Sequence, residues 1–411
     1  MHLYNIEIER FRAIKKLSLP LVDARDRIKP ITVIAGPNGS GKTSLVLAIA
    51  QALRGVMGVN LPDIPYPGKQ DVYRDEPAGR VPVRATVELG VEFGQEELKS
   101  ISKVLAREQS RSLLSQVRKP PPALVAGRMV GTWYYPQPEG EARDPGFQYS
   151  TDYLHPSPKG AGYWLTGAKV GWRQYTSREA EFRDIESIGM LRVFPQDRDA
   201  RLGLDAESSK LSDDPAADSN EFEEPLGFSS RLLDPSSAPR RSPTVRESLR
   251  RLGEWAQGKL PPNDVRRGWE RELQKRFSEI CHPKEYLGYW LDHPLYGETP
   301  LLKDGTREYP FSAAASGEHI ILHYLTKFTF PRPTNNGLIL IDEPELHLHP
   351  TWIRQLYRAL PLLGENNQFI MTTHSPELRQ IAAEEGCLID LGRLGDIATP
   401  PPDAERAALR V

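Results

Sequence analysis

Apolar and polar positions near the start of the chain predict a strand, a loop and a helix. Residues 3–8 (LYNIEI) alternate with period two, and residues 31–36 (ITVIAG) form a β-branched run that ends at glycine. Between residues 43 and 56, apolar side chains recur four positions apart, which is typical of the buried stripe of a helix. We therefore expect strands at the first two segments and a helix directly after the glycine.

The remaining patterns indicate more strands, a helical pair and a return to buried strands. Alternation reappears at 81–93 and in part of 129–136, which predicts a β-rich section. Helical patterns at 245–259 and 264–281 flank KLPPND, where one helix ends and the next begins. The apolar runs in GLILIDEP, QFIMTTHSP and CLIDLG have the length of buried parallel strands. An α/β core interrupted by other material is therefore predicted.

Length and composition favour a chain with more than one folded part, located in a reducing compartment. The 411 residues exceed the usual size of a single domain, so two folded parts or one core with a large insertion are expected. With 53 Lys+Arg against 55 Asp+Glu, the chain is not suited to coating nucleic acid uniformly, although local basic patches are permitted. Two distant cysteines and no long apolar run favour a cytoplasmic protein without disulfide framework, zinc site or membrane contact.

The segment between the second strand and the first helix carries a phosphate-binding pattern. Gly36-Pro37-Asn38-Gly39-Ser40-Gly41-Lys42-Thr43 has the spacing and the strand-to-helix context of a P-loop. Glycines let backbone N–H groups converge on phosphates, Lys42 reaches the β and γ phosphates, and Thr43 offers a hydroxyl to Mg²⁺. The sequence predicts ATP binding here, by Gly36, Asn38, Gly39, Ser40, Gly41, Lys42, Thr43 and Ser44.

Two carboxylates follow the apolar run LILI at 338–341. Asp342 and Glu343 lie at the carboxyl end of this predicted strand, where ligands collect on open α/β sheets. Asp342 is expected to hold Mg²⁺ through water, and Glu343 to deprotonate the attacking water as general base. His347 and His349 alternate like metal ligands, but their place just past the carboxylates favours a loop that contacts a second copy.

Two weaker signals lie nearby in the sequence. His374 follows the apolar run QFIM, so it too lies at a strand end, where an imidazole can donate to a γ-phosphate. Ser316-Gly317-Glu318 precedes a helical apolar run and can grip an anion at the helix start. Taken alone, the latter triplet is an ordinary helix cap.

The P-loop, SGE, LILIDEPELHLHP and TTHSP, in that order, resemble the ABC ATPase heads of the SMC, RecF and OLD families. The opening IEIERFRAIKKLSLPL is similar to the first strands of those heads. The resemblance implies an ABC-type P-loop ATPase core with a mixed sheet, which pairs through ATP. It covers about residues 1–56 and 310–391.

The resemblance also implies roles for individual residues. Ser316, Gly317 and Glu318 would form the signature motif that acts on the ATP of the partner head, although exporters read LSGGQ here. Residues 345–350 would be the D-loop and His374 the switch histidine. Gln196 is the candidate for the Q-loop residue near the metal, and Arg12 stands where related heads touch nucleotide. The alternative for Gln196 is a residue of a surface turn, and the alternative for Arg12 is an ordinary surface arginine.

The domain organisation follows from these matches. We expect the N-terminal lobe of the core at 1–100, an α+β insertion at 101–300, the C-terminal lobe at 301–395 and a tail at 396–411. Residues 205–244 form a polar linker, and glycines and prolines exclude long coiled-coil arms around the helical pair. The compact form resembles OLD-like ATPase subunits of phage-defence systems such as Gabija, Septu and PARIS, without the C-terminal Toprim nuclease.

Three functions compete. The first is an ATP-switched homodimer or higher oligomer of heads that regulates a separately encoded nuclease. The second is a repair or recombination ATPase that acts directly on DNA, for which the basic segment 239–276 is the candidate contact. A solvated helical face explains that segment equally well. A transporter ATPase is disfavoured by the long insertion and by the DEPELHLHP sequence.

Overall fold

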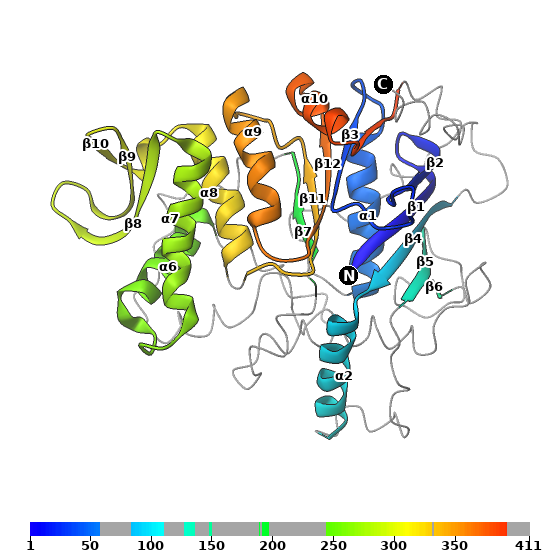
Figure 1. Cartoon of the computed structure of the whole chain (residues 1–411), viewed down its shortest axis with the longest axis horizontal. Helices are drawn as coiled ribbons and strands as arrows, with labels where there is room; N and C mark the ends of the chain where they lie inside the picture. Colours follow the sequence, from blue (N-terminus) through cyan, green and yellow to red (C-terminus); the bar gives the residue numbers. More distant parts are fainter. Residues whose placement is uncertain are drawn as a thin grey trace.

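The computed structural model describes residues 1–57, 84–110, 127–135, 148–149, 189, 191–196, 244–330 and 333–392. The predicted polar linker, apart from Thr244, and the predicted tail at 396–411 lie outside the described residues. The described residues form two five-stranded sheets, a three-stranded sheet and several helices (Figure 1).

A five-stranded sheet forms the centre of the molecule, and all its strand pairs are parallel. It confirms the strands predicted at 31–36 and in the three apolar runs near the C-terminus. The short fifth strand, β7, comes from the middle of the chain. In the order β13-β3-β12-β11-β7, the strands are Leu388–Asp390, Ile31–Ala35, Gln368–Thr373, Leu338–Asp342 and Leu191–Phe194.

Both faces of this sheet are covered, which explains why its strands are continuous apolar runs. In β11, Leu338 and Leu340 join one hydrophobic core, whereas Ile339 and Ile341 join another. The first core also contains helix α1 (Lys42–Met57), which packs between the parallel sheet and a second, antiparallel sheet (Figure 1).

The antiparallel sheet confirms the strands predicted at 3–8, 81–93 and 129–136. Its order is β2-β1-β4-β5-β6, and helix α2 (Gln95–Ser110) follows β4. Strands β1, β2, β4, β5 and β6 span His2–Phe11, Ile14–Pro20, Ala85–Phe93, Gly127–Tyr135 and Gln148–Tyr149. Parallel and antiparallel strands thus lie in separate sheets of one mixed α/β fold.

Helices cover the other face of the parallel sheet, and the predicted helical pair is among them. α6 (Val245–Glu254) begins at a capping box in which Thr244 and Glu247 bond each other's backbone N–H. It continues through the short turn η4 (Trp255–Lys259), and η5 (Val265–Gly268) leads into α7 (Trp269–Cys281). The remaining helices are η6 (Phe311–Ala313), α8 (Ser316–Thr329), α9 (Pro350–Ala359), η7 (Leu360–Leu362) and α10 (Pro376–Glu384).

A small antiparallel sheet between α7 and α8 was not predicted. Its strands are β8 (Lys284–His293), β9 (Gly297–Asp304) and β10 (Arg307–Pro310). Figure 1 shows it at the end of the molecule opposite to β1 and β2. The sequence signal is weak because β8 has bulges that break its alternation.

The fold agrees with the predicted α/β class, and no long coiled coil occurs among the described residues. The division into lobes, insertion and tail stays a prediction; inside the proposed insertion, β5 and β6 extend the N-terminal sheet and β7 completes the parallel one. Of the helices that the structure describes, none is both long and apolar enough to cross a bilayer.

Candidate ATPase site

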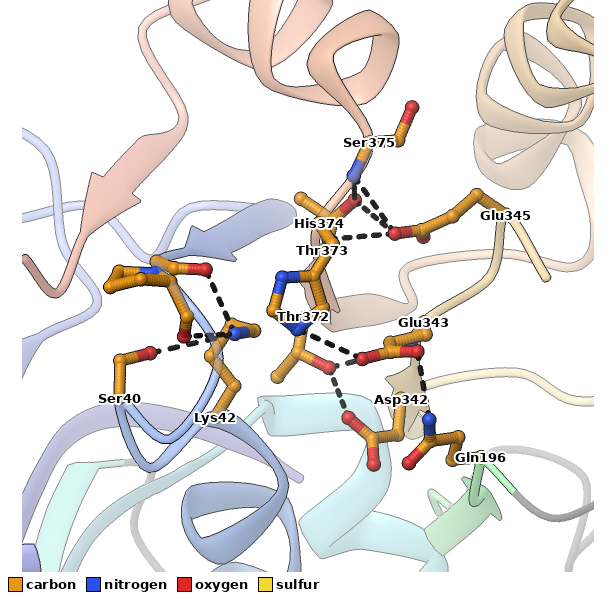
Figure 2. A network of polar contacts seen from close by, with 12 residues as sticks. Ser40, Lys42, Gln196, Asp342, Glu343, Glu345, Thr372, Thr373, His374 and Ser375 are labelled. Carbon is orange, nitrogen blue, oxygen red and sulfur yellow. Dashed lines mark hydrogen bonds and ion pairs between the residues drawn. The ribbon is translucent and has the colours of Figure 1, made fainter.

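Four neighbouring strands of the parallel sheet bring the predicted site residues to one edge. The register pairs Ala35 of β3 with Thr373 of β12, and Thr372 of β12 with Asp342 of β11, while β7 ends beside β11. Because all four strands run in the same direction, the segments that follow them leave the sheet together. Those segments carry Lys42, His374, Glu343 and Gln196 (Figure 2).

The P-loop lies between β3 and α1, in the predicted order of strand, loop and helix. Gly39 and Gly41 have φ of 78° and 89°, a backbone region that glycine adopts without strain. A Cβ on Gly36 would stand 2.5 Å from Oγ of Ser40, so the loop closes tightly on itself. Asn38 and Gly39 are exposed at its tip. The geometry is that of a loop whose backbone N–H groups are presented to an anion.

Lys42 is buried, and its ammonium lies inside the loop. Nζ donates to the carbonyl oxygens of Gly36 and Pro37, both at 2.9 Å. Burial lowers the pKa of Lys42 below its ordinary value, while the carboxylates of Glu343 and Asp342 oppose this shift. Thr43, the next residue, is exposed in the first turn of α1, whereas Ser40 and Ser44 are buried.

The two carboxylates at the end of β11 are held by the neighbouring strand. The hydroxyl of Thr372 donates to Asp342, which is 1% exposed. The backbone N–H of Glu343 donates to the carbonyl oxygen of Thr372 at 3.1 Å. Glu343 has φ of 51°, an uncommon value for a residue with a side chain and one that clusters at functional sites.

The carboxylate of Glu343 has a partner on each oxygen (Figure 2). Nε2 of Gln196 donates to Oε2 at 3.0 Å, and Nε2 of His374 lies 3.1 Å from Oε1. Burial raises the pKa of Glu343, and the charges of Asp342 and Glu345 add to that effect, whereas His374 and Lys42 lower it. Gln196, the Q-loop candidate from the family resemblance, and His374, predicted at a strand end, are thus brought to Glu343.

Glu345 is a site residue that the sequence reasoning did not single out beyond its membership of the predicted D-loop. Its Oε1 accepts from the hydroxyl of Thr373 and from the backbone N–H groups of His374 and Ser375. The only available signal was a third carboxylate two positions after Glu343.

The predicted signature motif lies at the start of α8, as expected for a helix N-terminus. Ser316 is exposed, and Gly317 is buried against the predicted D-loop: a Cβ there would stand 2.9 Å from the carbonyl oxygen of His347 and 3.1 Å from the ring of Trp352. The absence of a side chain at Gly317 therefore allows the two segments to touch.

Glu318 requires a correction. We expected it to face a partner's nucleotide with Ser316 and Gly317, but its carboxylate is 1% exposed and engaged within the chain. It accepts from Tyr309 and from the N–H of Ala315, and forms a 3.0 Å ion pair with Lys284. The third position of the motif caps α8 from inside, because an acidic group in a first helical turn satisfies a free N–H.

Other predicted residues lie apart from these contacts or act locally. Arg12 is exposed in the turn between β1 and β2, with φ of 49°, and its nucleotide contact stays a prediction. Nδ1 of His349 caps α9 by accepting from the N–H of Thr351 at 3.3 Å. Among the described residues, no group of three or more His, Cys, Asp and Glu side chains could hold a metal.

The residues at this edge fit ATP and Mg²⁺. The acceptors of Lys42 are loop oxygens that phosphate oxygens can replace. Thr43 and Asp342 supply hydroxyl and carboxylate oxygens, and Gln196 an amide oxygen, which are the hard donors that Mg²⁺ prefers. These three residues would hold the ion.

Comparison with known proteins gives matches over both halves of the chain. Residues 5–116 match a family described as "AAA domain", and residues 175–379 match one described as "AAA domain, putative AbiEii toxin, Type IV TA system". A 42-residue segment is 50% identical to the retron Ec83 probable ATPase of Escherichia coli, and covers 10% of this chain and 8% of that protein.

A 47-residue segment is 49% identical to Septu protein PtuA of Bacillus thuringiensis, and covers 11% of this chain and 12% of that protein. The chain thus spans about a tenth of the length of these curated relatives. Among solved structures, the SmcHead bound to the C-winged helix domain of ScpA gives a TM-score of 0.48 at 13% identity, covering 92% of this chain and 91% of that one. The SMC head domain from Thermotoga maritima gives 0.36 at 16% identity, covering 92% of each chain.

Proposed function

Because the chain is an ATPase of the AAA families, we propose that it hydrolyses ATP at the carboxyl edge of its parallel sheet, with Glu343 as general base. The observation that carries the proposal is that the carboxylate of Glu343 contacts both Gln196 and His374 beside the P-loop. A buried carboxylate with raised pKa is suited to taking a proton near neutral pH.

Substrate binding follows from the P-loop. Its backbone N–H groups and the N-terminus of α1 attract the phosphates. The ammonium of Lys42 exchanges its bonds to Gly36 and Pro37 for bonds to phosphate oxygens. Mg²⁺ held by Thr43, Asp342 and Gln196 would supply positive charge that neutralises the phosphates.

Hydrolysis requires Glu343 to accept a proton from water. The water oxygen attacks the γ-phosphorus, the bond from that phosphorus to the β–γ bridging oxygen breaks, and the products are ADP and phosphate. Each oxygen of Glu343 accepts from one side chain and keeps a further lone pair for the water. Nε2 of His374 can leave Glu343 and donate instead to the γ-phosphate.

The exposed start of α8 supports a pair of heads. Ser316 is exposed at the start of α8, where its hydroxyl and the positive end of the helix dipole favour an anion. The D-loop packs against Gly317 in the same chain, so both segments belong to one surface. A second copy placed there would receive Ser316 and Gly317 at its own ATP, giving a homodimer or a higher oligomer.

A separately encoded effector is the proposed target of the ATP cycle. The matched relatives include Septu protein PtuA and retron probable ATPases, and the chain resembles defence ATPases in its motifs. Four exposed apolar side chains gather at the β8–β9 turn, a composition that favours protein contact. They are Trp290, Leu291, Leu295 and Tyr296. We place the effector, a nuclease in anti-phage defence, on this turn.

DNA binding is the second candidate, and one observation favours it. Some basic residues of the helical pair have acidic partners within the chain; for example, Arg266 pairs with Asp264 and Arg276 with Glu272. Arg267, Arg271 and Lys275 have no acidic partner among the described residues. They recur every four positions through η5 and α7, so they line one helical face.

The decisive test is Glu343→Gln. We expect kcat for ATP hydrolysis to fall by about 100-fold or more, because the general base is lost while the binding residues stay. Nucleotide affinity, measured with a fluorescent ATP analogue, should change little. Glu384→Gln, which removes an exposed carboxylate on α10, is the control. Hydrolysis at the wild-type rate in the Glu343 variant would overturn the proposal. The effector role predicts separately that the purified chain with ATP and Mg²⁺ or Mn²⁺ leaves plasmid intact.

A further inference from the structure

Glu345 connects the loop after β11 to the loop after β12. Its Oε1 accepts from the hydroxyl of Thr373 at 2.7 Å, the N–H of His374 at 2.7 Å and the N–H of Ser375 at 3.0 Å (Figure 2). One carboxylate oxygen thus receives three donors from consecutive residues, a dense arrangement that fixes the backbone around His374.

This backbone determines where the imidazole lies. The side chain of His374 is 34% exposed, so packing alone does not hold it. Its N–H is bonded to Glu345, and its ring meets Glu343 at 3.1 Å. Glu343 and Glu345 are two positions apart on the same loop. This one loop therefore contacts both the backbone of His374, through Glu345, and its ring, through Glu343.

We propose that Glu345 is a positioning residue for ATP hydrolysis, which sets the place of the His374 imidazole relative to the Glu343 carboxylate. The inference rests on the proposed function of the same site. It implies that any movement of the D-loop, to which Glu345 belongs, is passed to His374 through this oxygen.

A purely structural alternative is that Glu345 caps the start of α10. That helix already has a cap, because the hydroxyl of Ser375 accepts from the N–H of Leu378. Oε2 of Glu345 is buried and has no hydrogen-bond partner among the described residues. An unsatisfied carboxylate oxygen costs stability, so an amide would cap this loop as well. The three bonds to Oε1 are therefore better explained by the placement of His374 than by capping of α10.

Kinetics separate the two explanations. Glu345→Ala should lower kcat by about 10- to 100-fold through misplacement of His374, with little change in KM for ATP. Glu345→Gln keeps an acceptor oxygen and should retain most of the rate. In a His374→Ala background, Glu345→Ala should cause little further loss, because a group that acts through His374 has nothing left to position. Glu384→Ala, which removes an exposed carboxylate of α10, is the control and should leave kcat unchanged.

Hydrogen exchange tests the positioning without hydrolysis. The amides of His374 and Ser375 should exchange faster in Glu345→Ala than in wild type, whereas in Glu384→Ala their exchange should be unchanged. If the chain hydrolyses no ATP, the proposed function fails. The exchange result alone then still tests whether Glu345 holds the backbone of His374 in place. Unchanged exchange overturns the inference. Where ATP is hydrolysed, full additivity of Glu345→Ala and His374→Ala, or a wild-type kcat in Glu345→Ala, overturns it as well.

Discussion

Nε2 of His374 lies 3.1 Å from Oε1 of Glu343, so the proposed switch histidine and the proposed general base share one contact. Burial raises the pKa of Glu343, and a charged imidazole at this distance lowers it again. The side chain of His374 can therefore lower the pKa of Glu343. It can also end this contact by donating to a phosphate instead.

Removing His374 should shift the pH dependence of hydrolysis. In His374→Ala the lowering effect on the pKa of Glu343 is lost, so that pKa rises further above its ordinary value. Glu343 must be ionised to accept a proton, and activity falls as pH drops through its pKa. The acid limb of kcat should move to higher pH, with a rate loss of about 10- to 100-fold. A limb that stays in place or moves to lower pH would show that the contact does not tune Glu343.

Paired heads should form through Ser316. Glu343→Gln slows hydrolysis and should accumulate an ATP-bound dimer, whereas adding Ser316→Arg should abolish that dimer by placing bulk at the start of α8. Ser312→Arg, at another exposed serine just upstream, is the matched control. Light scattering with ATP and Mg²⁺ measures the masses. A monomeric Glu343 variant, or equal effects of the two arginines, would argue against this interface.

The chemistry at strand ends could be predicted from the sequence because short apolar runs directly precede it. Lys42, Glu343 and His374 each follow such a run within a few residues, and parallel strands deliver them to one edge. Glu345 escaped notice because its partners are 28 to 30 residues away, and a hydrogen bond between two loops leaves no periodic signal.

Charge patterns were the least informative part of the sequence. The basic segment 239–276 shows an excess of cations, but Arg250, Arg251 and Lys259 all lie within ion-pair distance of Glu254. Glu318 likewise stood in a motif expected to face a partner, yet it turns inward to Lys284. Which charges are neutralised is decided by tertiary contacts, whereas apolar periodicity is visible locally.

Gly317 should not tolerate a methyl group. In Gly317→Ala the added Cβ would stand 2.9 Å from the carbonyl oxygen of His347, which must then move with the D-loop. We expect a loss of about 1 to 3 kcal/mol in the free energy of unfolding from overpacking, together with slower hydrolysis. Gly268→Ala, where a Cβ meets nothing within 4 Å, is the control and should leave both unchanged. Urea denaturation and steady-state kinetics measure the two effects, and equal behaviour of the variants would contradict the close packing.

Gln368 should stabilise the contact between the two large sheets. Its buried side chain accepts from the N–H of Leu3 and donates to the carbonyl oxygen of Leu3, both at 2.7 Å. Gln368→Ala leaves two backbone groups without these partners, so we expect a loss of about 2 to 5 kcal/mol in the free energy of unfolding. Gln380→Ala, which removes an exposed glutamine on α10, should cost less than about 0.5 kcal/mol. Similar denaturation midpoints for the two variants would show that the contact contributes little.

The basic face of α7 offers the sharpest test of DNA binding. If Arg267, Arg271 and Lys275 contact phosphates, changing all three to Glu should weaken binding and reduce the slope of log K against log salt by about 2 to 3, because each contact releases a counterion. The control carries Glu at three paired basic positions near the start of the chain, which gives the same change in net charge. These are Lys16, Arg27 and Lys99. Fluorescence anisotropy with a duplex at several salt concentrations measures both. A specific effect of the α7 variant favours direct action on DNA, whereas identical slopes for the two variants would leave the α7 face as a solvated surface.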